Sequence, residues 1–150
     1  VADPGNAGTL IRAAFASGAG AVVLAGGVDP SNPKVVRASA GAIFAGPVAV
    51  GADPVTAGEE LRAGGYRLVG AVAHDGRPYD DVDLSGPIAV VLGNEAHGIA
   101  ADLDAILDER VTIPLAGPVE SLNVAMAGTV LCFEVLRQRR GNASRSLGGA

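Results

Sequence analysis

The sequence predicts an α/β fold, in which helices flank a mostly parallel sheet. Short aliphatic runs alternate with segments of helical character along the chain, and this alternation is typical of the class. Hydrophobic residues make up 49% of the 150 residues, whereas aromatic residues make up only 3%. The core must therefore be built from Val, Leu, Ile and Ala, which suits parallel strands buried on both faces.

Five short aliphatic runs are predicted as strands, because each is bounded by residues that favour turns. In chain order they are Ala21–Ala25, Val48–Val50, Tyr66–Val72, Ile88–Leu92 and Arg110–Ile113. The segment from His74 to Pro78 is predicted as a turn. The aliphatic composition of the strands favours parallel pairing, with helices covering both faces of the sheet.

Five segments between these runs are predicted as helices. Asp53 followed by Pro54 is a typical start, a capping acceptor before proline at the first helical position. Ser121 is expected to cap the longest helix, and Gly141 to end it after a basic last turn. The predicted helices lie near Asn6–Ser17, Pro33–Ala38, Pro54–Ala63, Ala101–Leu107 and from about Leu122 to Arg139.

The chain has the length of a single domain. We expect residues 1–140 to form it and residues 141–150 to be a disordered tail, because the tail shows no periodicity. An α/β domain usually begins with a strand, yet the first predicted helix opens at Asn6. This start suggests that a first strand is missing and that the chain is part of a longer protein.

Composition excludes several kinds of site. The single cysteine, Cys132, rules out an internal disulfide and a cysteine-based zinc site, and His74 and His97 are too few for a histidine site. We expect no metal. No apolar run reaches the roughly 20 residues of a membrane span, and no signal peptide is visible, so we expect a cytoplasmic protein without a membrane partner. The net charge of −5 argues, taken alone, against broad nucleic-acid binding.

The first segment with chemical character runs from Asp3 to Arg12 (DPGNAGTLIR). A turn rich in Gly and Asn lets the backbone approach a ligand closely. Arg12 is the only charged side chain between Asp3 and Asp29. The alternative is an ordinary capped helix with one arginine facing solvent.

The second segment, Val91–Gly98 (VLGNEAHG), directly follows a predicted buried strand. It therefore lies at a strand's carboxyl end, where open α/β sheets bind their ligands. Asn94 and Glu95 offer acceptors, and Gly93 and Gly98 allow tight turning with exposed amides. An ordinary polar loop is the alternative.

The third segment, from Ile113 to Ala125, holds two prolines and a glycine ahead of the longest helix. It predicts a stiff loop that ends at Ser121 and Asn123, where free backbone amides favour an electronegative partner. Simple capping by Ser121 is the alternative. Glycine fingerprints of dinucleotide-binding and phosphate-loop proteins and the GxSxG elbow of hydrolases are not found in the sequence.

In this order the three segments resemble the three motifs of the SpoU (TrmH-like) branch of the SPOUT methyltransferases. DPGNAGTLIRAAFASGA resembles the first motif, VVLGNEAHGI the second and VTIPLAGPVESLNVAMAGTVLCFEVLRQR the third. The resemblance covers nearly all of residues 3–140. It implies the SPOUT fold, a mostly parallel sheet flanked by helices with a deep trefoil knot in its C-terminal part. It also implies that an N-terminal RNA-binding domain is missing from this catalytic domain.

The resemblance further implies a function, S-adenosyl-L-methionine-dependent 2′-O-methylation of a ribose in RNA. We expect rRNA rather than tRNA as the substrate and a homodimer formed through the knot region. An RNA-binding domain elsewhere would reconcile the acidic charge with an RNA substrate. Alternatives are a tRNA 2′-O-methyltransferase, a non-catalytic knotted module that binds RNA or cofactor, and a Rossmann-type enzyme, which the missing glycine fingerprint disfavours.

Matching the family's positions residue by residue identifies candidate site residues. The candidate catalytic residues are Asn6, Arg12, Glu95, Ser121 and Asn123. The candidate cofactor-binding residues are Ala71, Val72, Ala73, Leu92, Gly93, Ile113, Leu122 and Asn123. A guanidinium stays protonated, so Arg12 is expected to orient the ribose and phosphate and to stabilise a developing alkoxide rather than act as a base. Glu95 is expected to hold Asn6 or Arg12 in place. A cluster of Arg137, Arg139, Arg140 and Arg145 is either a solvated helix end or an RNA contact.

Overall fold

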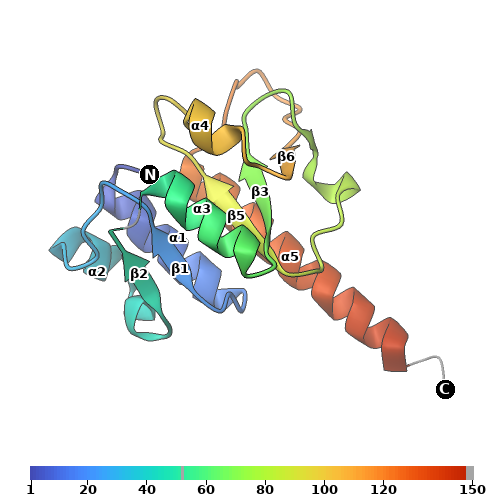
Figure 1. Ribbon diagram of the computed structural model, residues 1–150, viewed down its shortest axis with the longest axis horizontal. Coiled ribbons are helices and arrows are strands. Elements are labelled where there is room, and N and C mark those ends of the chain that lie inside the picture. Colours follow the sequence, from blue (N-terminus) through green and yellow to red (C-terminus); the bar gives the residue numbers. More distant parts are fainter. Residues whose placement is uncertain (52, 148–150) are drawn as a thin grey trace.

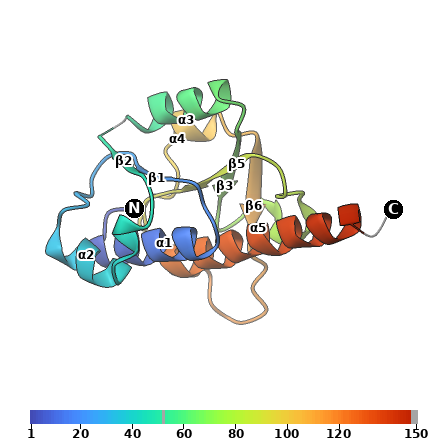
Figure 2. The same ribbon diagram turned by 90° about the horizontal axis from the view of Figure 1, so that it is seen from below.

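A layer of parallel strands lies between two layers of helices (Figure 2). The computed structural model describes residues 1–51 and 53–147. Helices α3 (Pro54–Ala63) and α4 (Ala101–Asp104) cover one side of the strands, and α1 (Pro4–Ala16) and α5 (Val124–Leu147) cover the other. Helix α2 (Pro33–Ser39) packs against α1 (Figure 1). The predicted α/β class with helices on both faces is confirmed.

The strands form two sheets, and every pairing recorded between their strands is parallel. Strand β1 (Val22–Leu24) pairs with β2 (Val48–Val50). The second sheet has the order β4-β6-β3-β5, and its strands are β3 (Arg67–Ala71), β4 (Arg77–Pro78), β5 (Ile88–Leu92) and β6 (Glu109–Thr112). After β5 the chain therefore crosses to the far side of β3, which brings the carboxyl ends of β5, β3 and β6 together.

All five predicted strands are found. The structure adds β4, a two-residue strand at the end of the predicted turn, where Asp75 adopts a φ of 60°. Two short 3₁₀ helices, η1 (Ala42–Phe44) and η2 (Tyr79–Asp81), follow α2 and β4. Helix α4 ends at Asp104, earlier than predicted.

Capping side chains set the starts of the first and last helices. Helix α1 begins at Pro4 because Asp3 Oδ1 accepts the Asn6 N–H at 2.9 Å. The predicted cap of α5 was wrong, because Asn123, and not Ser121, lies at that position. Asn123 Oδ1 accepts the backbone N–H groups of Ala125 at 2.9 Å and Met126 at 3.3 Å, so α5 starts at Val124.

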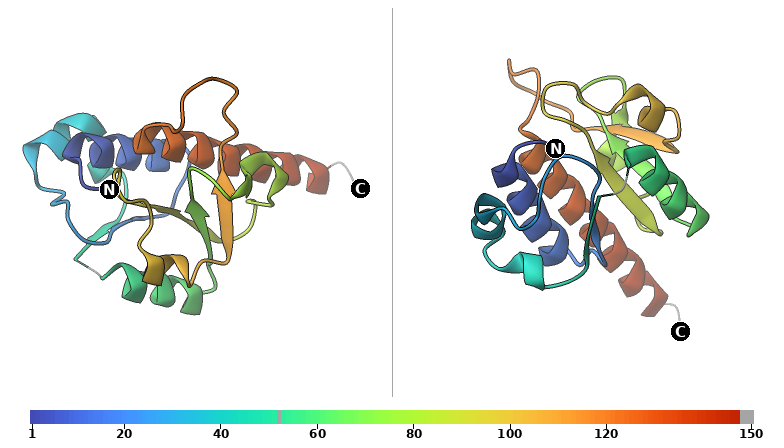
Figure 3. Two further views of the ribbon diagram at one scale, coloured as in Figure 1. Left: turned by 90° about the horizontal axis from the view of Figure 1, so that it is seen from above. Right: turned by 60° about the vertical axis from the view of Figure 1, so that its left-hand side comes forward.

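The predicted end of α5 at Gly141 was also wrong. The helix continues to Leu147, and its last turns project beyond the body of the molecule (Figure 3). A helical Gly141 costs only about 1 kcal/mol relative to alanine, which does not stop a helix anchored further back. Gln138 supplies such an anchor, since it accepts from the Leu84 N–H at 2.7 Å and donates to the Val82 carbonyl at 3.0 Å. Residues 148–150 of the predicted tail lie outside the described residues.

Two clusters of buried aliphatic side chains form the core. The first joins β3 and β6 to α5, and the second joins α1 to α2 and to the residues around β1 and β2. Their buried members are Val69, Val82, Leu84, Val111, Leu131 and Val135 in the first, and Ala7, Ile11, Val28 and Val35 in the second. None of the helices in the described part of the chain combines the length and apolarity of a membrane span.

Candidate functional site at the carboxyl ends of the strands

Residues from three neighbouring strands meet at one edge of the larger sheet. In the register of β3 with its neighbours, Ala71 lies beside both Leu92 of β5 and Val111 of β6. The Val72 N–H donates to the Val111 carbonyl at 2.9 Å, which holds the chain beyond β3 against β6. Thr112 Oγ1 donates to the Ala73 carbonyl at 3.0 Å.

This register places most of the predicted cofactor residues close together. Ala71, Val72 and Ala73 leave β3 beside Leu92, and Gly93 directly follows Leu92. Ile113 directly follows the end of β6 at Thr112. The clustering arises from topology, because the crossover after β5 puts β6 on the other side of β3.

A hydrogen-bonded chain of three side chains joins the three motifs. The Asn6 side-chain amide donates to Glu95 Oε1 at 3.0 Å, and the Asn123 amide donates to Asn6 Oδ1 at 3.1 Å. Asn6 lies in the first turn of α1, Glu95 in the loop after β5, and Asn123 at the cap of α5. The structure therefore brings together three of the five predicted catalytic residues from positions up to 117 residues apart.

Glu95 is held as an anion in this chain. Its carboxylate also accepts the backbone N–H groups of Ala2 at 2.9 Å and Asp3 at 3.2 Å. Burial by itself would raise the pKa of Glu95, but the hydrogen bonds from Asn6 and from backbone N–H groups outweigh it and lower the pKa from 4.5 to about 2. At neutral pH Glu95 is an acceptor only, which fixes Asn6 with its amide toward Glu95 and its carbonyl oxygen toward Asn123.

The loop after β5 is closed on itself. Asn94 and Gly98 exchange two backbone hydrogen bonds of 2.8 Å, and Asn94 Oδ1 accepts the Ala96 N–H at 2.8 Å. Asn94 was expected to offer its oxygen to a ligand, but that oxygen caps the loop instead. Gly93 is required by close packing, since a Cβ there would lie 2.5 Å from the Ile99 nitrogen.

A glycine in α5 lets the helices approach the strand that carries this loop. A Cβ at Gly128 would lie 2.7 Å from a methyl group of Leu92 and would overlap a methyl group of Leu10. Helix α5 therefore lies directly against both α1 and β5. This close approach brings the caps of the two helices near the end of β5.

Two predicted catalytic residues lie outside the hydrogen-bonded chain. Arg12 is exposed, and its side chain makes no hydrogen bond or ion pair in the described part of the protein. Six residues along a helix correspond to about 9 Å and a rotation of about 120°, so Arg12 points to a different side of α1 from Asn6. Ser121 is exposed and likewise makes no hydrogen bond or ion pair to a described residue; it lies in the loop from β6 to α5, which stands away from the body (Figure 2).

Some contributors to the site were missed by the sequence analysis. The backbone N–H groups of Ala2 and Asp3 leave no signal in a sequence, since every residue but proline has one. Asp3 itself could have been found, because Asp3-Pro4 repeats the capping pattern seen at Asp53-Pro54. The Asp3 carboxylate also pairs with Lys34 at 3.0 Å, which ties α2 to the start of α1.

Two hollows on the described surface lie away from this edge. One, of about 460 Å³, is lined by α5 side chains that include Phe133, Arg137 and Arg140. The other, of about 220 Å³, lies beside β6 among charged residues that include Arg77 and Arg110. Neither includes a predicted cofactor residue, so strand register and hydrogen bonding locate the candidate site better than enclosed volume does.

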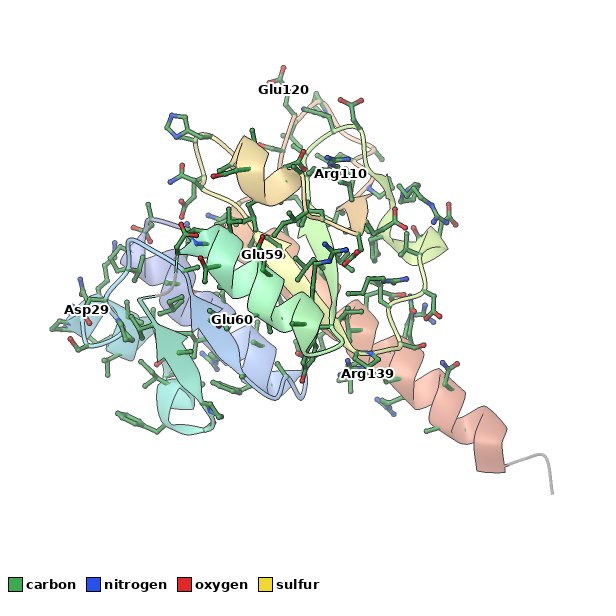
Figure 4. The ribbon with its side chains drawn as sticks, viewed as in Figure 1. Asp29, Glu59, Glu60, Arg110, Glu120 and Arg139 are labelled. Carbon is green, nitrogen blue, oxygen red and sulfur yellow. The ribbon has the colours of Figure 1, made fainter. Side chains whose placement is uncertain are left out.

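Other charged side chains face solvent. Glu59 and Glu60 lie on the outer side of α3, and Glu120 lies far out on the loop from β6 to α5 (Figure 4). Arg139 instead donates to the carbonyl oxygens of Ser85 at 3.3 Å and Gly86 at 3.0 Å, so it secures α5 to the turn before β5.

Fold and site together define a class: a parallel α/β protein whose site lies where a chain crossover gathers three strand ends beside the caps of two helices. The SpoU rRNA Methylase family matches residues 1–133. The chain belongs to this family.

The chain spans about half the length of the two methyltransferases described next. It is 40% identical over 136 residues to 23S rRNA (guanosine(2553)-2′-O)-methyltransferase RlmP of Bacillus subtilis (strain 168), covering 90% of this chain and 54% of that protein. It is 37% identical over 143 residues to 23S rRNA (uridine(2479)-2′-O)-methyltransferase of Streptomyces viridochromogenes, covering 91% and 50%. The crystal structure of the SpoU methyltransferase AviRb from Streptomyces viridochromogenes in complex with AdoMet matches with a TM-score of 0.85 at 36% identity, over 93% of this chain and 58% of that one.

Proposed function

We propose that this chain is the catalytic part of an S-adenosyl-L-methionine-dependent RNA 2′-O-ribose methyltransferase that acts on rRNA. The observation that carries the proposal is the Asn6–Glu95–Asn123 chain, because it unites all three family motifs at the strand ends. Two relatives named above are 23S rRNA 2′-O-methyltransferases, which favours rRNA over tRNA as the substrate.

The residues at the strand ends suit such a cofactor. Leu92 and Ile113 are half-buried and Leu122 is exposed, so they offer apolar surface at the mouth of the site. Backbone groups near Ala71–Ala73, Gly93 and Asn123 would supply the polar contacts, and the small side chain of Ala71 leaves room for a close approach. When bound, S-adenosyl-L-methionine supplies a methyl group on a sulfonium, an electrophile that needs alignment rather than activation.

The protein's own residues would position the RNA and stabilise the attacking oxygen while its proton passes to solvent water. Glu95, an anion with a low pKa, holds Asn6, and Asn6 in turn holds Asn123 at the cap of α5. Ser121, two residues before that cap, would contact the nucleotide. Arg12 would orient the ribose and phosphate and stabilise negative charge on the attacking oxygen.

The position of Arg12 supports a dimer in which it serves the partner's site. Arg12 and Asn6 point to different sides of α1, so Arg12 does not point toward the site that Asn6 helps to form in the same chain. Helix α5 also exposes Met126, Val130 and Phe133 at a spacing of i, i+4 and i+7. These residues form one apolar stripe, which we name the α5 stripe, and a second copy would remove it from water.

Other expectations stay predictions. They are the trefoil knot, the single catalytic domain over residues 1–140, the preceding first strand, the separate RNA-binding domain and the cytoplasmic location. In the described sheets β1 pairs only with β2, and β5 pairs only with β3. Each strand therefore offers one edge on which an additional strand would find unpaired backbone groups.

Arg12→Ala in the full-length protein tests the proposal. We expect loss of methyl transfer to unmodified 23S rRNA with unchanged binding of S-adenosyl-L-methionine in calorimetry, because Arg12 is assigned to the RNA and not to the cofactor. Arg62→Ala is the matched control, since Arg62 pairs with Asp108 at 3.0 Å on another part of the surface. Loss of cofactor binding in Arg12→Ala would contradict this division of roles.

The same assay decides between the proposal and a non-catalytic binding module. A wild-type protein that binds S-adenosyl-L-methionine and RNA but transfers no tritium-labelled methyl group would support the module. Transfer to unmodified tRNA in place of 23S rRNA would keep the enzyme class and overturn the substrate.

A further inference from the structure

The N-terminal third of the chain has a charge distribution unlike the rest. Residues 1–52 carry three cationic side chains against two acidic ones, whereas residues 53–150 carry eight against fourteen. Between Asp3 and Asp53 the only acidic residue is Asp29. The surface of α1, α2 and η1 is therefore nearly free of the carboxylates that would repel a nucleic acid.

Two arginines in this part are unpartnered. Arg12 and Arg37 are exposed, and neither side chain makes a hydrogen bond or ion pair with any described residue. Most other arginines whose side chains the structure describes are engaged, as in the pairs of Arg62 with Asp108 and Arg110 with Asp104. Arg37 lies in the last turn of α2, where its positive charge interacts favourably with the helix dipole. This interaction needs only the charge and leaves the five N–H donors of the guanidinium free.

The same part of the chain carries the most exposed large apolar side chain of the described residues. Phe44 at the end of η1 is 83% exposed, in a chain with only three phenylalanines. Exposure of this degree removes almost none of the ring from water on folding, so core packing does not explain it.

Backbone conformation and packing hold the segment that carries Phe44 in place. Ala40 and Gly41 both adopt left-handed conformations, with φ of 49° and 84°, and turn the chain sharply out of α2. The Phe44 N–H donates to the Gly41 carbonyl at 3.1 Å. Ile43, the preceding residue, packs into the core cluster around Ile11. Phe44 is thus held outward by a segment anchored to α1.

Contacts with two residues of α1 place this segment along that helix. Ile11 precedes Arg12 and lies in the cluster that Ile43 joins. Phe15, one turn after Arg12 on neighbouring faces of the helix, packs against Gly46. Residues 43–46 therefore run along the side of α1 that carries Ile11 and Phe15. Arg37 lies six residues before Ile43 on α2, which also packs against α1.

We propose that Phe44 and Arg37, on two segments that both pack against α1, bind single-stranded RNA nucleotides that flank the methylated ribose. Phe44 would stack on a base, and Arg37 would contact a phosphate, the combination by which proteins commonly hold unpaired RNA. The inference rests on the proposed function, because it takes Arg12 to lie at the target nucleotide. Unpaired RNA is favoured over a protein partner because the aromatic ring is accompanied by two free guanidiniums and few carboxylates.

Binding of a labelled single-stranded 12-nucleotide oligouridylate, followed by fluorescence anisotropy at several salt concentrations, tests the surface in the full-length protein. We expect Phe44→Ala to weaken binding by roughly 5- to 100-fold, the range for one lost base stack, and Phe44→Trp to restore it. Phe44→Leu keeps an apolar side chain but should bind as weakly as Phe44→Ala. Arg37→Gln should reduce the slope of log affinity against log salt by about 0.7.

Matched controls lie elsewhere on the chain. Tyr66→Ala removes an aromatic ring that is 45% exposed near the start of β3, and Arg140→Gln removes an exposed arginine on α5. Both should leave the affinity and the salt slope unchanged. Melting temperature and S-adenosyl-L-methionine binding should also be unchanged in Phe44→Ala, because the ring is exposed.

Methyl transfer to unmodified 23S rRNA separates this inference from the proposed function. Phe44→Ala should raise the KM for RNA while preserving kcat, since the ring is assigned to a flanking nucleotide and not to the reacting atoms. If the wild type methylates the RNA and both Phe44→Ala and Arg37→Gln keep its KM, the proposed binding surface is overturned and the proposed function stands. Altered oligomeric state of Phe44→Ala with unaltered RNA affinity would overturn that surface too, in favour of a protein interface. Failure of the wild type to methylate any RNA would instead overturn the proposed function.

Discussion

Three hydrogen bonds to the Glu95 carboxylate determine its role in this protein. Its carboxylate receives donors from two backbone groups and one side chain, and only an ionised carboxylate can accept all of them well. The same donors hold Asn6 in one orientation, and through Asn6 they hold Asn123. The role assigned to Glu95 is therefore positioning, since it acts on the site through its neighbours.

The depressed pKa of Glu95 predicts a stability contribution that depends on pH. The folded-state pKa of about 2 lies below the ordinary 4.5, so the contribution is complete above about pH 4.5 and is lost as pH falls toward 2. Glu95→Gln, which offers one acceptor oxygen instead of two, should lower the free energy of unfolding at pH 6. This deficit should shrink as the pH falls.

Urea unfolding of the wild type and the variant at pH 6, 4 and 3 measures the effect. Glu59→Gln, an exposed substitution on α3, is the matched control and should show no such trend. If Glu95→Gln lowers the free energy of unfolding by the same amount at all three pH values, Glu95 is not held as a carboxylate by hydrogen bonds in the folded protein.

At the scale of elements, small residues set how closely the helices approach the strands. Helix α5 contacts both α1 and β5 where Gly128 presents no side chain. The approach brings the caps of α1 and α5 near the end of β5, and the Asn6–Glu95–Asn123 chain depends on it. In the same helix a Cβ at Gly141 would meet no described atom within 4 Å, so the lack of a side chain there serves no contact.

Two alanine substitutions in α5 should therefore have opposite effects. Gly128→Ala should destabilise the fold by roughly 1–3 kcal/mol, because the added methyl group overlaps Leu10 and Leu92. Gly141→Ala should be neutral or stabilising by up to about 1 kcal/mol, because alanine favours the helix and the position is open. Chemical denaturation of both variants checks the contrast, and stabilisation by Gly128→Ala would show that α5 is not packed so tightly.

At the scale of the whole molecule, the proposed dimer depends on surfaces that one chain leaves exposed. Met126 is 60% exposed on the α5 stripe, although the opposite face of the same helix carries the buried Leu131 and Val135. A helix with apolar residues on both faces needs a partner on each. The direction of Arg12 points to the same arrangement.

Val130→Glu places a charge in the middle of the α5 stripe and should convert the proposed dimer to a monomer. Light scattering after size-exclusion chromatography measures the mass, and methyl transfer should fall with dimer content if Arg12 serves the partner's site. Tyr66→Glu, at an exposed aromatic position near β3, is the matched control. An unchanged mass for Val130→Glu would remove the α5 stripe from the interface.

Local sequence was sufficient to predict most of the helices and strands. Aliphatic runs bounded by turn residues predicted all five strands, because such patterns depend on near neighbours in the chain. Two boundaries of α5 went wrong for the same reason. Asn123 displaced Ser121 as the cap, and contacts from Gln138 to residues 82–84 carry the helix past Gly141. By contrast, Asn6, Glu95 and Asn123 were candidates that the resemblance to the SpoU family implied, and the structure joins them by hydrogen bonds.

Which of these residues meet depends on the packing of the whole chain. Strand order, the crossover after β5 and the packing at Gly128 are long-range properties, and they join Asn6 to Glu95 and Asn123 while turning Arg12 to another side. The structure likewise revealed that Arg37 and Phe44 stand exposed beside α1, since exposure depends on what the rest of the chain covers. The periodicity of helices and strands depends on neighbouring residues in the sequence. The contact between Asn6 and Asn123, which are 117 residues apart, depends on how the whole chain packs.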